Sequence, residues 1–391
     1  MRTQVGIVGA GPAGLLLGHL LHLAGIDSVI LEARSRAHVE SRIRAGVMEH
    51  QAAELLRAAG LGARMDREGL VHHGVVLRFG GASHRIDLTE LSGGRSIMVY
   101  GQHEVVRDLI AARLAAELPI LFDADCVAVD GFMAGSPRIA FRHDGAAQTL
   151  ECDIIAGCDG FHGICRPAMP TGTLREFDRS YPFGWLGILA EVAPASEELV
   201  YASHDRGFAL LSMRSPTVSR LYLQVAPDED LGQWPDSRIW DELRLRLADE
   251  AGFVLPEGPI LQKGVTAMRS YVAEPMQAGR LFLLGDAAHI VPPTGAKGMN
   301  LAFADVAVLA RALDAWFASG DAALLDAYSA TALRRVWKAE RFSWWMTSLL
   351  HRFDSHGPFE RRMQLAELDY ITSSPIGAAT LAENYVGLPV G

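Results

Sequence analysis

The sequence predicts an α/β fold in three parts: an N-terminal nucleotide-binding domain, an inserted domain of mostly antiparallel β-sheet, and a helical C-terminal region. A short apolar strand at residues 4–8 precedes a Gly-rich turn and an apolar helix at residues 13–24. Strand-like stretches cluster at residues 184–226, and long apolar helices follow Asn300. We place the three parts at residues 1–175 (with part of 70–100 joining the second domain), 176–290 and 291–391.

The composition limits the classes of function. The chain has 391 residues, 49% of them hydrophobic, which is enough for more than one core. Its formal net charge is −10 and it has no basic stripe, so we expect no nucleic-acid partner. It has no signal-peptide pattern and no apolar run long enough to span a membrane. The four cysteines form no C-x-x-C pair, so we expect a cytoplasmic protein with free thiols and no metal site.

The N-terminal strand–helix–strand unit carries a dinucleotide-binding motif. Residues 9–14 read GAGPAG, a G-x-G-x-x-G that follows a strand and opens a helix. Gly9 and Gly11 let a pyrophosphate approach the backbone, and Gly14 lets the helix pack on the strand. Glu32 ends the second strand, where a carboxylate can accept hydrogen bonds from a ribose. The motif predicts a Rossmann-like domain but does not by itself separate FAD from NAD.

Two later segments end apolar strands in an acidic turn. Asp159 follows a strand-like stretch at residues 153–155, and Asp286 follows one at residues 280–284. Taken singly, each reads equally well as an ordinary strand-ending turn. Together with the GAGPAG turn, they resemble the flavoprotein monooxygenases that hold FAD in one dinucleotide-binding domain and share that domain with NAD(P)H. The resemblance implies that Asp286 binds the ribitol of FAD and that Asp159 serves both cofactors.

The loop VPPTGAKGMN at residues 291–300 leads into the C-terminal helical region. We expect Asn300 to cap the helix that begins there. A helix N-terminus directs partial positive charge at its surroundings, which would stabilise a reduced flavin that is anionic around N1 and the C2 carbonyl. The alternative interpretation is an ordinary Gly/Pro loop before a capped helix.

A predicted β-hairpin in the second domain places four polar side chains on one face. With the turn centred on Thr217, Arg214 lies opposite Arg220 and Ser212 lies opposite Tyr222. Two facing arginines repel one another unless an anion lies between them. Guanidinium, hydroxyl and phenol groups together suit a carboxylate. The alternative is a solvated polar face whose arginines point to water.

Further stretches make the resemblance specific. The chain resembles the 4-hydroxybenzoate 3-monooxygenase family of class A flavoprotein aromatic hydroxylases over essentially its whole length. The matching stretches are residues 41–47, 100–102, 181–187, 292–300, 337–346 and 382–389. The resemblance implies an enzyme that uses FAD, NAD(P)H and O2 to convert 4-hydroxybenzoate, a small aromatic acid, to 3,4-dihydroxybenzoate through a C4a-hydroperoxyflavin. A related flavin hydroxylase for another hydroxy- or aminobenzoate is the alternative.

The resemblance also implies roles at the substrate. Three side chains would hold the substrate carboxylate: Ser212, Arg214 and Tyr222. The catalytic set would be Tyr201, which bonds the substrate phenol, Tyr385, which bonds Tyr201, His72, which connects this relay to solvent, and Pro293, whose carbonyl also meets the phenol. A relay suits this reaction because a phenolate is a better nucleophile than a phenol at its ortho carbon, and histidine titrates near neutrality.

Two sets of residues are implied for the cofactors, with Arg44 shared between them. The FAD set is Gly9, Gly11, Ala13, Gly14, Glu32, Arg42, Arg44, Gln102, Asp159, Arg220, Asp286, Lys297, Met299 and Asn300, where Arg220 faces the flavin and helps control its movement. The NAD(P)H set is Arg34, His38, Arg44, His162, Arg166 and Arg269.

Some positions depart from the family pattern. NADPH-specific relatives carry an arginine and a tyrosine where this sequence has Ala33 and His38, although Arg34 and Arg36 can still reach a 2′-phosphate. We therefore expect NADPH, with NADH as an alternative. Ala13 stands where the family commonly has a serine, which removes one hydroxyl contact to the pyrophosphate and leaves the backbone donors.

The apolar C-terminal helices predict a homodimer interface, with internal packing as the alternative. Two other classes of function compete with hydroxylation. A flavin disulfide reductase would carry a C-x-x-C or C-x4-C pair, which this sequence lacks. A simple flavin reductase or oxidase and a non-catalytic dinucleotide-binding sensor stay open at this point.

Overall fold

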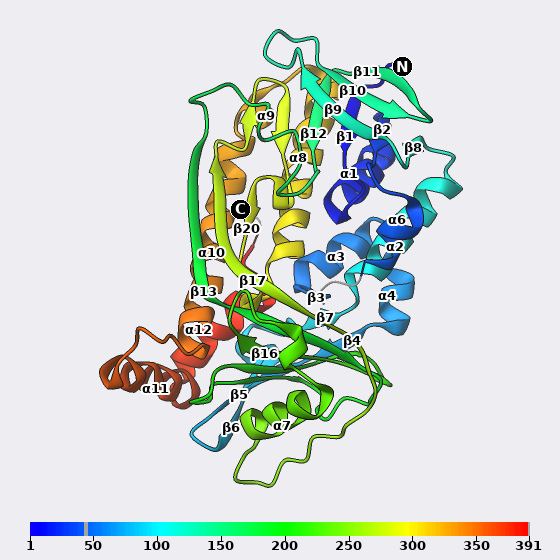
Figure 1. Cartoon of the computed structure of the whole chain (residues 1–391). Helices are drawn as coiled ribbons and strands as arrows, with labels where there is room; N and C mark the ends of the chain where they lie inside the picture. Colours follow the sequence, from blue (N-terminus) through cyan, green and yellow to red (C-terminus); the bar gives the residue numbers. More distant parts are fainter. Residues whose placement is uncertain (43–45, 390–391) are drawn as a thin grey trace.

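The chain builds two sheet-based regions at opposite ends of the molecule. A computed structural model describes residues 1–42 and 46–389. The nucleotide-binding domain lies at one end and a large sheet lies at the other (Figure 1). Strands β13 (Arg175–Ala190) and β17 (Ile260–Glu274) and helix α10 (Tyr328–Leu350) run between the two ends. The predicted α/β fold, with an inserted mostly antiparallel sheet and a helical C-terminal region, is confirmed.

The nucleotide-binding domain is built on a six-stranded sheet in the order β18-β19-β12-β1-β2-β8. All neighbouring strands are parallel except β18 and β19. The strands are β1 (Val5–Val8), β2 (Ser28–Leu31), β8 (Ile120–Leu121), β12 (Ile154–Gly157), β18 (Gln277–Ala278) and β19 (Leu281–Leu283). Strands β1, β2, β12 and β19 are buried along their whole length, which is why they read as continuous apolar runs.

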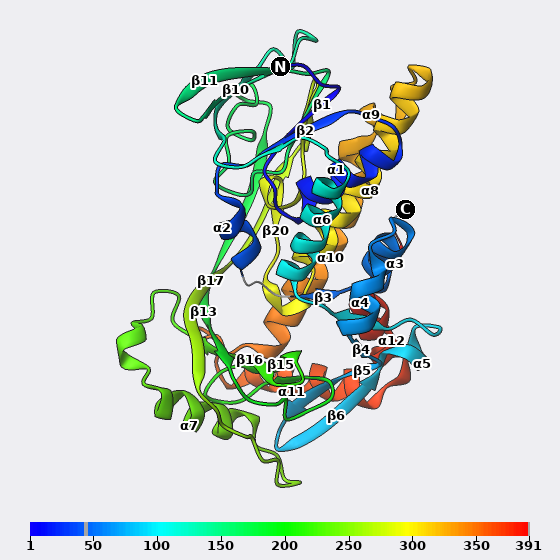
Figure 2. The same cartoon turned by 90° about the vertical axis from the view of Figure 1, so that its right-hand side faces the viewer.

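Helices cover this sheet and connect its strands. Helix α1 (Pro12–Leu23) packs against both α6 (Gln102–Ala115) and α8 (Gly298–Ser319), and the three lie side by side in Figure 2. Shorter helices complete the domain: α2 (Arg36–Ser41), α3 (His50–Ala58), α4 (Gly62–Glu68) and α5 (Leu88–Leu91).

Two small sheets flank the domain. An antiparallel sheet in the order β11-β10-β9 consists of β9 (Asp125–Asp130), β10 (Arg138–His143) and β11 (Ala146–Glu151). A second antiparallel sheet in the order β3-β7-β4 consists of β3 (Val47–Met48), β4 (Leu70–His72) and β7 (Ile97–Val99).

The large sheet has eight strands in the order β20-β17-β13-β16-β15-β14-β5-β6, and only the β14–β5 pair is parallel. Its remaining strands are β5 (Gly74–Phe79), β6 (Ala82–Asp87), β14 (Leu199–Ala202), β15 (Ala209–Ser215), β16 (Val218–Val225) and β20 (His289–Ile290). Side chains alternate between its faces. One face packs in a core with α7 (Asp236–Leu247), and the other packs in a core with α10 and the last two helices.

The hairpin between β15 and β16 has a different register from the predicted one. Ser215 pairs with Val218, which leaves a two-residue turn, and a bulge at Arg214 then sets Ser212 opposite Arg220. Both cross-strand pairs that we predicted are therefore wrong. A bulge adds one residue to one strand only, and the alternation of side chains in the sequence does not reveal it.

The C-terminal region is helical. It contains α8, α10, α9 (Ala323–Asp326), α11 (Pro358–Ser373) and α12 (Pro375–Val386), and three short 3-10 turns lie elsewhere at η1 (Leu231–Gln233), η2 (Gly285–Ala287) and η3 (Pro293–Gly295). Of the helices in the described ranges, none is both long and apolar enough to cross a membrane.

Candidate active site

The turn after β1 has the geometry of a nucleotide-binding loop. Gly9 has a φ of +102°, and a Cβ there would lie 2.4 Å from the Cys158 carbonyl oxygen. A Cβ on Gly14 would lie 2.0 Å from the Gly9 oxygen. Packing within the protein therefore leaves no room for a side chain at either position. Glu32 fixes the turn, since its carboxylate accepts from the Ala10 N–H at 2.7 Å.

Gly11 is different, because no contact among the described residues requires a glycine there. Its φ is −73°, which any residue adopts, and a Cβ would meet no described atom within 4 Å. Gly11 is the N-cap of α1 and has no side chain to cap the helix. The open space beside the first N–H groups of a helix is where a pyrophosphate binds.

Two acidic turns lie at the carboxyl ends of neighbouring parallel strands. Asp286 follows β19 and is exposed, although the residues on both sides of it are buried. Asp159 follows β12, accepts from the Cys165 N–H at 2.9 Å through Oδ2, and has a buried Oδ1 without a partner among the described residues. Burial raises the pKa of Asp159. Both carboxylates are therefore available to a ligand at this sheet edge, where ligands of open α/β sheets bind.

Two tyrosines from distant parts of the chain meet in the core of the large sheet. Tyr201 lies on β14 and Tyr385 on α12, and their hydroxyl oxygens are 2.5 Å apart. Each side chain is 2% exposed. Burial raises the pKa of both phenols above the usual value. The pair is therefore neutral at neutral pH, and it can pass a proton along the hydrogen bond to a group that Tyr201 contacts.

A cluster of polar groups lies on the adjacent hairpin. The Arg214 guanidinium is 3.4 Å from Ser212 Oγ and 3.5 Å from Tyr222 Oη, so the three side chains share one site despite the altered register. Tyr222 lies opposite Leu210, on the same face of the sheet as Tyr201. Burial would raise the pKa of the Tyr222 phenol, but two neighbouring guanidiniums outweigh this effect and lower it.

Two arginines in this cluster lack a carboxylate. In the described part of the chain, neither Arg214 nor Arg220 forms an ion pair, and Arg214 Nε and Arg220 Nη1 are buried without hydrogen-bond partners. Burial lowers the pKa of Arg214. A buried, uncompensated guanidinium is unfavourable unless an anion joins it, so this cluster is built to receive one.

Comparisons with known proteins identify the family. A family described as FAD binding domain matches residues 2–343. The p-hydroxybenzoate hydroxylase of Acinetobacter baylyi is 49% identical over 389 residues, which covers 100% of this chain and 96% of that protein. This chain belongs to the p-hydroxybenzoate hydroxylase family. It is an FAD-dependent monooxygenase.

More distant proteins share the fold. The p-nitrophenol 4-monooxygenase PnpA of Pseudomonas putida DLL-E4 superposes with a TM-score of 0.84 and covers 99% of both chains at 20% identity. The FAD-dependent monooxygenase penE of Penicillium thymicola is 25% identical over 370 residues, which covers 87% of this chain and 75% of that protein. This chain thus has the overall architecture of the p-nitrophenol 4-monooxygenase.

The residues present fit FAD. Gly11 leaves a cradle that a Cβ would fill, and the exposed Asp286 and the buried, unpartnered oxygen of Asp159 lie at the same sheet edge. Ala13 and Gln102 lie in the first turns of α1 and α6. Arg42 ends α2, and Arg44 lies outside the described residues.

The loop before α8 is held by buried polar bonds. Asn300 does not cap the helix as predicted, since Lys297 is the N-cap and Met299 lies in the first turn. The Asn300 side chain instead accepts from the Glu49 N–H at 2.9 Å and donates to the Val47 carbonyl at 3.0 Å. Asn300 therefore joins the loop to β3 and the residue that follows it, a contact that local capping rules do not predict.

Lys297 is buried in an ion pair that the sequence did not reveal. Its amino group donates to Glu49 Oε1 at 2.7 Å and to the Asn384 carbonyl at 2.5 Å. Arg335 donates to the other Glu49 oxygen at 2.5 Å. Two cations thus share one carboxylate, which leaves net positive charge beside the tyrosine pair. Burial lowers the pKa of Lys297.

Three residues predicted for the nicotinamide cofactor gather around one ring. The guanidinium carbons of Arg166 and Arg269 lie 4.4 Å and 4.3 Å from the Phe161 centroid, and exposed His162 is its neighbour in sequence. Arg34 and His38 are exposed on the segment that follows β2.

His72 does not contact the tyrosine pair directly. It lies on β4 with 1% of its surface exposed, and neither ring nitrogen has a hydrogen-bond partner among the described residues. Burial lowers its pKa to about 4, so the ring is neutral at neutral pH. No direct hydrogen bond joins His72 to Tyr201 or Tyr385 in the described residues, so the predicted connection of the relay to solvent is not made by such a bond.

A buried acid outside the predicted set lies on α10. Glu340 is 5% exposed, its Oε1 has no partner in the described chain, and burial raises its pKa from 4.5 to about 7. No sequence signal marks this residue, since a single glutamate in a helix usually faces water.

We predict that Gly11→Ala loses FAD without losing the fold. The added Cβ occupies the pyrophosphate cradle and touches no protein atom, so we expect FAD affinity to fall roughly tenfold or more. Absorbance gives the FAD content, and the Tm of the FAD-free protein reports the fold. Gly14→Ala is the contrasting variant, because its Cβ collides with the Gly9 carbonyl and should lower that Tm. Equal FAD content in Gly11→Ala and the unaltered protein contradicts the assignment.

We predict that Glu340→Gln stabilises the protein at high pH only. The raised pKa means that the native state favours neutral Glu340, so this contribution to stability is complete below pH 4.5 and is lost as pH rises through 7. At about 1.4 kcal/mol per pKa unit, ionised Glu340 costs about 3 kcal/mol. Urea unfolding at pH 5 and pH 8 measures the difference, with exposed Glu197→Gln as the control. A gain that is the same at both pH values rules out ionisation as its cause.

Proposed function

We propose that this chain hydroxylates 4-hydroxybenzoate at position 3, with NADPH as the reductant. The observation that carries the proposal is the combination, on one face of the large sheet, of a guanidinium without a carboxylate and a buried tyrosine pair. A substrate with a carboxylate at one end of a ring and a phenol hydroxyl at the other can pair with the guanidinium and hydrogen-bond the tyrosine pair at the same time. The 49% identity to a p-hydroxybenzoate hydroxylase supports this substrate.

At the acidic end, Arg214 binds the carboxylate with two parallel N–H groups, and Ser212 and Tyr222 donate from their hydroxyls. The long distances of 3.4 Å and 3.5 Å from the guanidinium to these hydroxyls leave both groups able to turn toward an anion. Binding the carboxylate also compensates the buried charge of Arg214, so affinity and orientation have the same source.

At the other end, the proton of the substrate phenol passes to Tyr201 Oη as the proton of Tyr201 passes to Tyr385 Oη, and Tyr385 releases its own proton toward the solvent, so both tyrosines stay neutral. The Pro293 carbonyl, which already accepts from the Ala296 N–H at 2.9 Å, has a second lone pair for the phenol. The positive charge of Lys297 and Arg335 favours the phenolate that results. When bound, reduced FAD supplies the activation of O2, and the phenolate directs the oxygen to its ortho carbon. The sheet and helices α10 and α12 exclude water from this site.

We predict that 4-hydroxybenzoate stimulates oxidation of NADPH and yields 3,4-dihydroxybenzoate. Oxidation is followed at saturating NADPH and NADH, with and without substrate, and the products are identified by mass spectrometry. NADPH should be preferred, but NADH should also react, because Arg36 is paired with Glu40 at 2.6 Å and is less available to a 2′-phosphate. Stimulation by 3-hydroxybenzoate or an aminobenzoate but not by 4-hydroxybenzoate overturns the substrate assignment. H2O2 without a dihydroxy product supports an oxidase.

We predict that Tyr201→Phe slows hydroxylation by about a hundredfold or more, because the proton path begins at its hydroxyl. The Kd of 4-hydroxybenzoate should change only a few-fold, since the carboxylate contacts remain. Rapid-mixing kinetics measures the rate, and flavin fluorescence measures the Kd. Tyr181→Phe removes another buried tyrosine hydroxyl, which bonds Ser270 at 3.2 Å, and should leave the rate nearly unchanged. Equal rates for the two variants exclude the relay.

We also propose a homodimer that uses the outer face of α11. Phe359, Met363 and Tyr370 are 72%, 55% and 52% exposed, and their spacing places them within about 40° of one another around the helix. Ile376, at the start of α12, is 74% exposed. An exposed apolar stripe of this kind is typical of an interface, and a second copy of the chain is its proposed occupant.

We predict that Phe359→Glu converts the dimer to a monomer, because a charge would lie in the apolar contact. Sedimentation velocity over a range of concentrations measures the mass. Val254→Glu changes another apolar side chain, 79% exposed on a loop, and should leave the dimer intact. A monomeric unaltered protein, or a Phe359→Glu variant that remains dimeric, contradicts this interface.

A further inference from the structure

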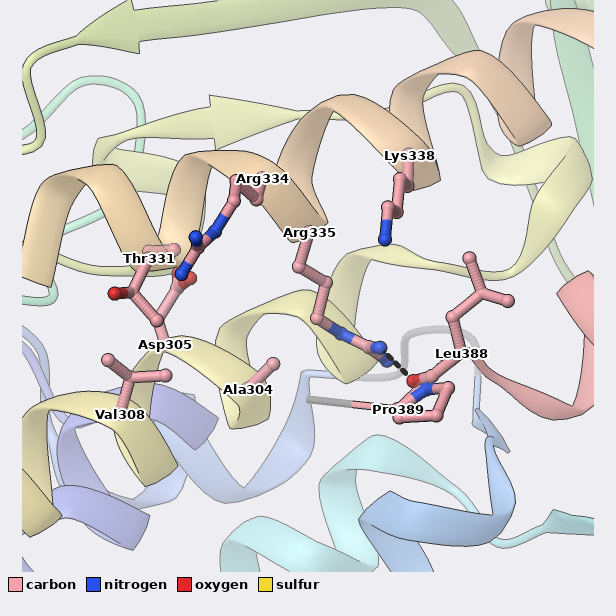
Figure 3. A pocket seen from close by; sticks show the side chains of 10 residues that line it. Ala304, Asp305, Val308, Thr331, Arg334, Arg335, Lys338, Leu388 and Pro389 are labelled. Carbon is pink, nitrogen blue, oxygen red and sulfur yellow. Dashed lines mark hydrogen bonds between the residues drawn. The ribbon is translucent and has the colours of Figure 1, made fainter. Parts of the chain in front are cut away.

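A cavity of about 80 Å³ lies between α8, α10 and residues 388–389 (Figure 3). None of the residues proposed above for substrate or cofactor lines it. Its wall carries three cationic side chains from α10, Arg334, Arg335 and Lys338. Positions 334 and 338 are one helical turn apart and face the same way. The cavity is therefore a basic pocket beside the candidate active site, to which Arg335 connects it through the ion pair with Glu49.

The positive charge of this pocket is compensated only in part, because Arg335 pairs with Glu49, whereas the exposed Arg334 and Lys338 have no carboxylate partner in the described residues. Within residues 1–42 and 46–389, Arg334 and Lys338 form no ion pair or hydrogen bond, and the buried Nε of Arg335 has no partner. Figure 3 shows the Lys338 amino group pointing toward Arg335 and Leu388 rather than away from the protein. The other N–H groups of Arg335 donate to the Leu388 carbonyl and to Glu49.

One carboxylate also lines the pocket, and its charge is already used. Asp305 is 1% exposed, lies 2.7 Å from His289 Nε2, and accepts from the Gly285 N–H at 2.9 Å. Burial lowers the pKa of His289, but the Asp305 carboxylate outweighs this effect, so the pKa of His289 is raised. Because Asp305 pairs with His289 and Glu49 pairs with Arg335, the positive charge of Arg334 and Lys338 remains in excess.

We propose that this pocket binds a small tetrahedral oxyanion of the phosphate or sulfate class. The space of about 80 Å³ is several times the roughly 10–15 Å³ that one water molecule requires by the same measure, so a small anion fits it. An oxyanion beside Arg335 accepts from its Nε and from Lys338, and Arg334, one helical turn before Lys338, adds positive charge to the pocket. The anion supplies the partner that the buried Nε lacks.

The pocket is connected to the tyrosine pair by bonded residues. Arg335 bonds Glu49, Glu49 bonds Lys297, and Lys297 donates to the Tyr385 carbonyl at 3.1 Å. An anion beside Arg335 reduces the positive potential along this chain. An anion in the pocket is therefore expected to lower the affinity of the candidate active site for a phenolate. This expected coupling rests on the proposed function, but the binding of the anion does not.

The test is calorimetric titration of the FAD-loaded protein with inorganic phosphate, against chloride at matched ionic strength. We expect saturable phosphate binding that Arg334→Gln with Lys338→Gln weakens roughly tenfold or more. The control double variant, Arg311→Gln with Arg362→Gln, removes the same charge from exposed positions outside the pocket and should bind phosphate as the unaltered protein does. Inorganic sulfate should compete with phosphate, and adenosine 2′-phosphate should not compete at this site.

Phosphate binding no stronger than that of chloride, or equal binding by the two double variants, overturns the proposal. Competition by adenosine 2′-phosphate that the pocket variant abolishes reassigns the pocket to a nucleotide phosphate. None of these measurements requires turnover, so they remain decisive even if 4-hydroxybenzoate proves not to be the substrate.

Discussion

The hydrogen bond between Tyr201 and Tyr385 is the contact on which the site depends. It joins an inner strand of the large sheet to the last helix, across 184 positions of sequence, inside a hydrophobic core. A phenol buried this deeply needs a partner, and each tyrosine satisfies the other. The bond therefore fixes α12 against the sheet and at the same time aligns a proton path, so packing and chemistry impose the same geometry.

The candidate active site has two ends that differ in charge. Arg214 lacks a carboxylate partner among the described residues, whereas Lys297 shares Glu49 with Arg335. The uncompensated end selects an anion, and the partly compensated end holds positive potential without binding a second carboxylate. A long, rigid acid with its ionisable groups at opposite ends of a ring suits this division, because each end meets the charge that it requires.

Local patterns predicted the parts of the fold that depend on local physics. The GAGPAG turn, the strand before it and Glu32 occupy the places that spacing and burial required, because a parallel strand leading into a helix leaves few arrangements. Contacts between distant segments were beyond such patterns. The pairing of Tyr201 with Tyr385 was implied only by family resemblance, and nothing local marked Glu49 as the partner of Lys297.

Two local predictions were wrong for physical reasons. Arg214 sits in a bulge, which shifts every pair beyond it, and the even alternation of side chains carries no trace of the inserted residue. Asn300 was expected to cap α8, but its side chain bonds the backbone around β3. For Asn300, tertiary bonds outweighed the local preference. The side chains at the site still converge, since the Arg214 guanidinium lies 3.4 Å from Ser212 Oγ and 3.5 Å from Tyr222 Oη.

The position of α12 in the chain has a consequence for biosynthesis. The nucleotide-binding turn is translated within the first residues, but the second tyrosine of the pair emerges only with the final helix. A nascent chain can therefore form its first βαβ elements on the ribosome long before it can complete the core around Tyr201 and Tyr385. Tyr201 cannot form its hydrogen bond to Tyr385 until the last turn of α12 has left the exit tunnel.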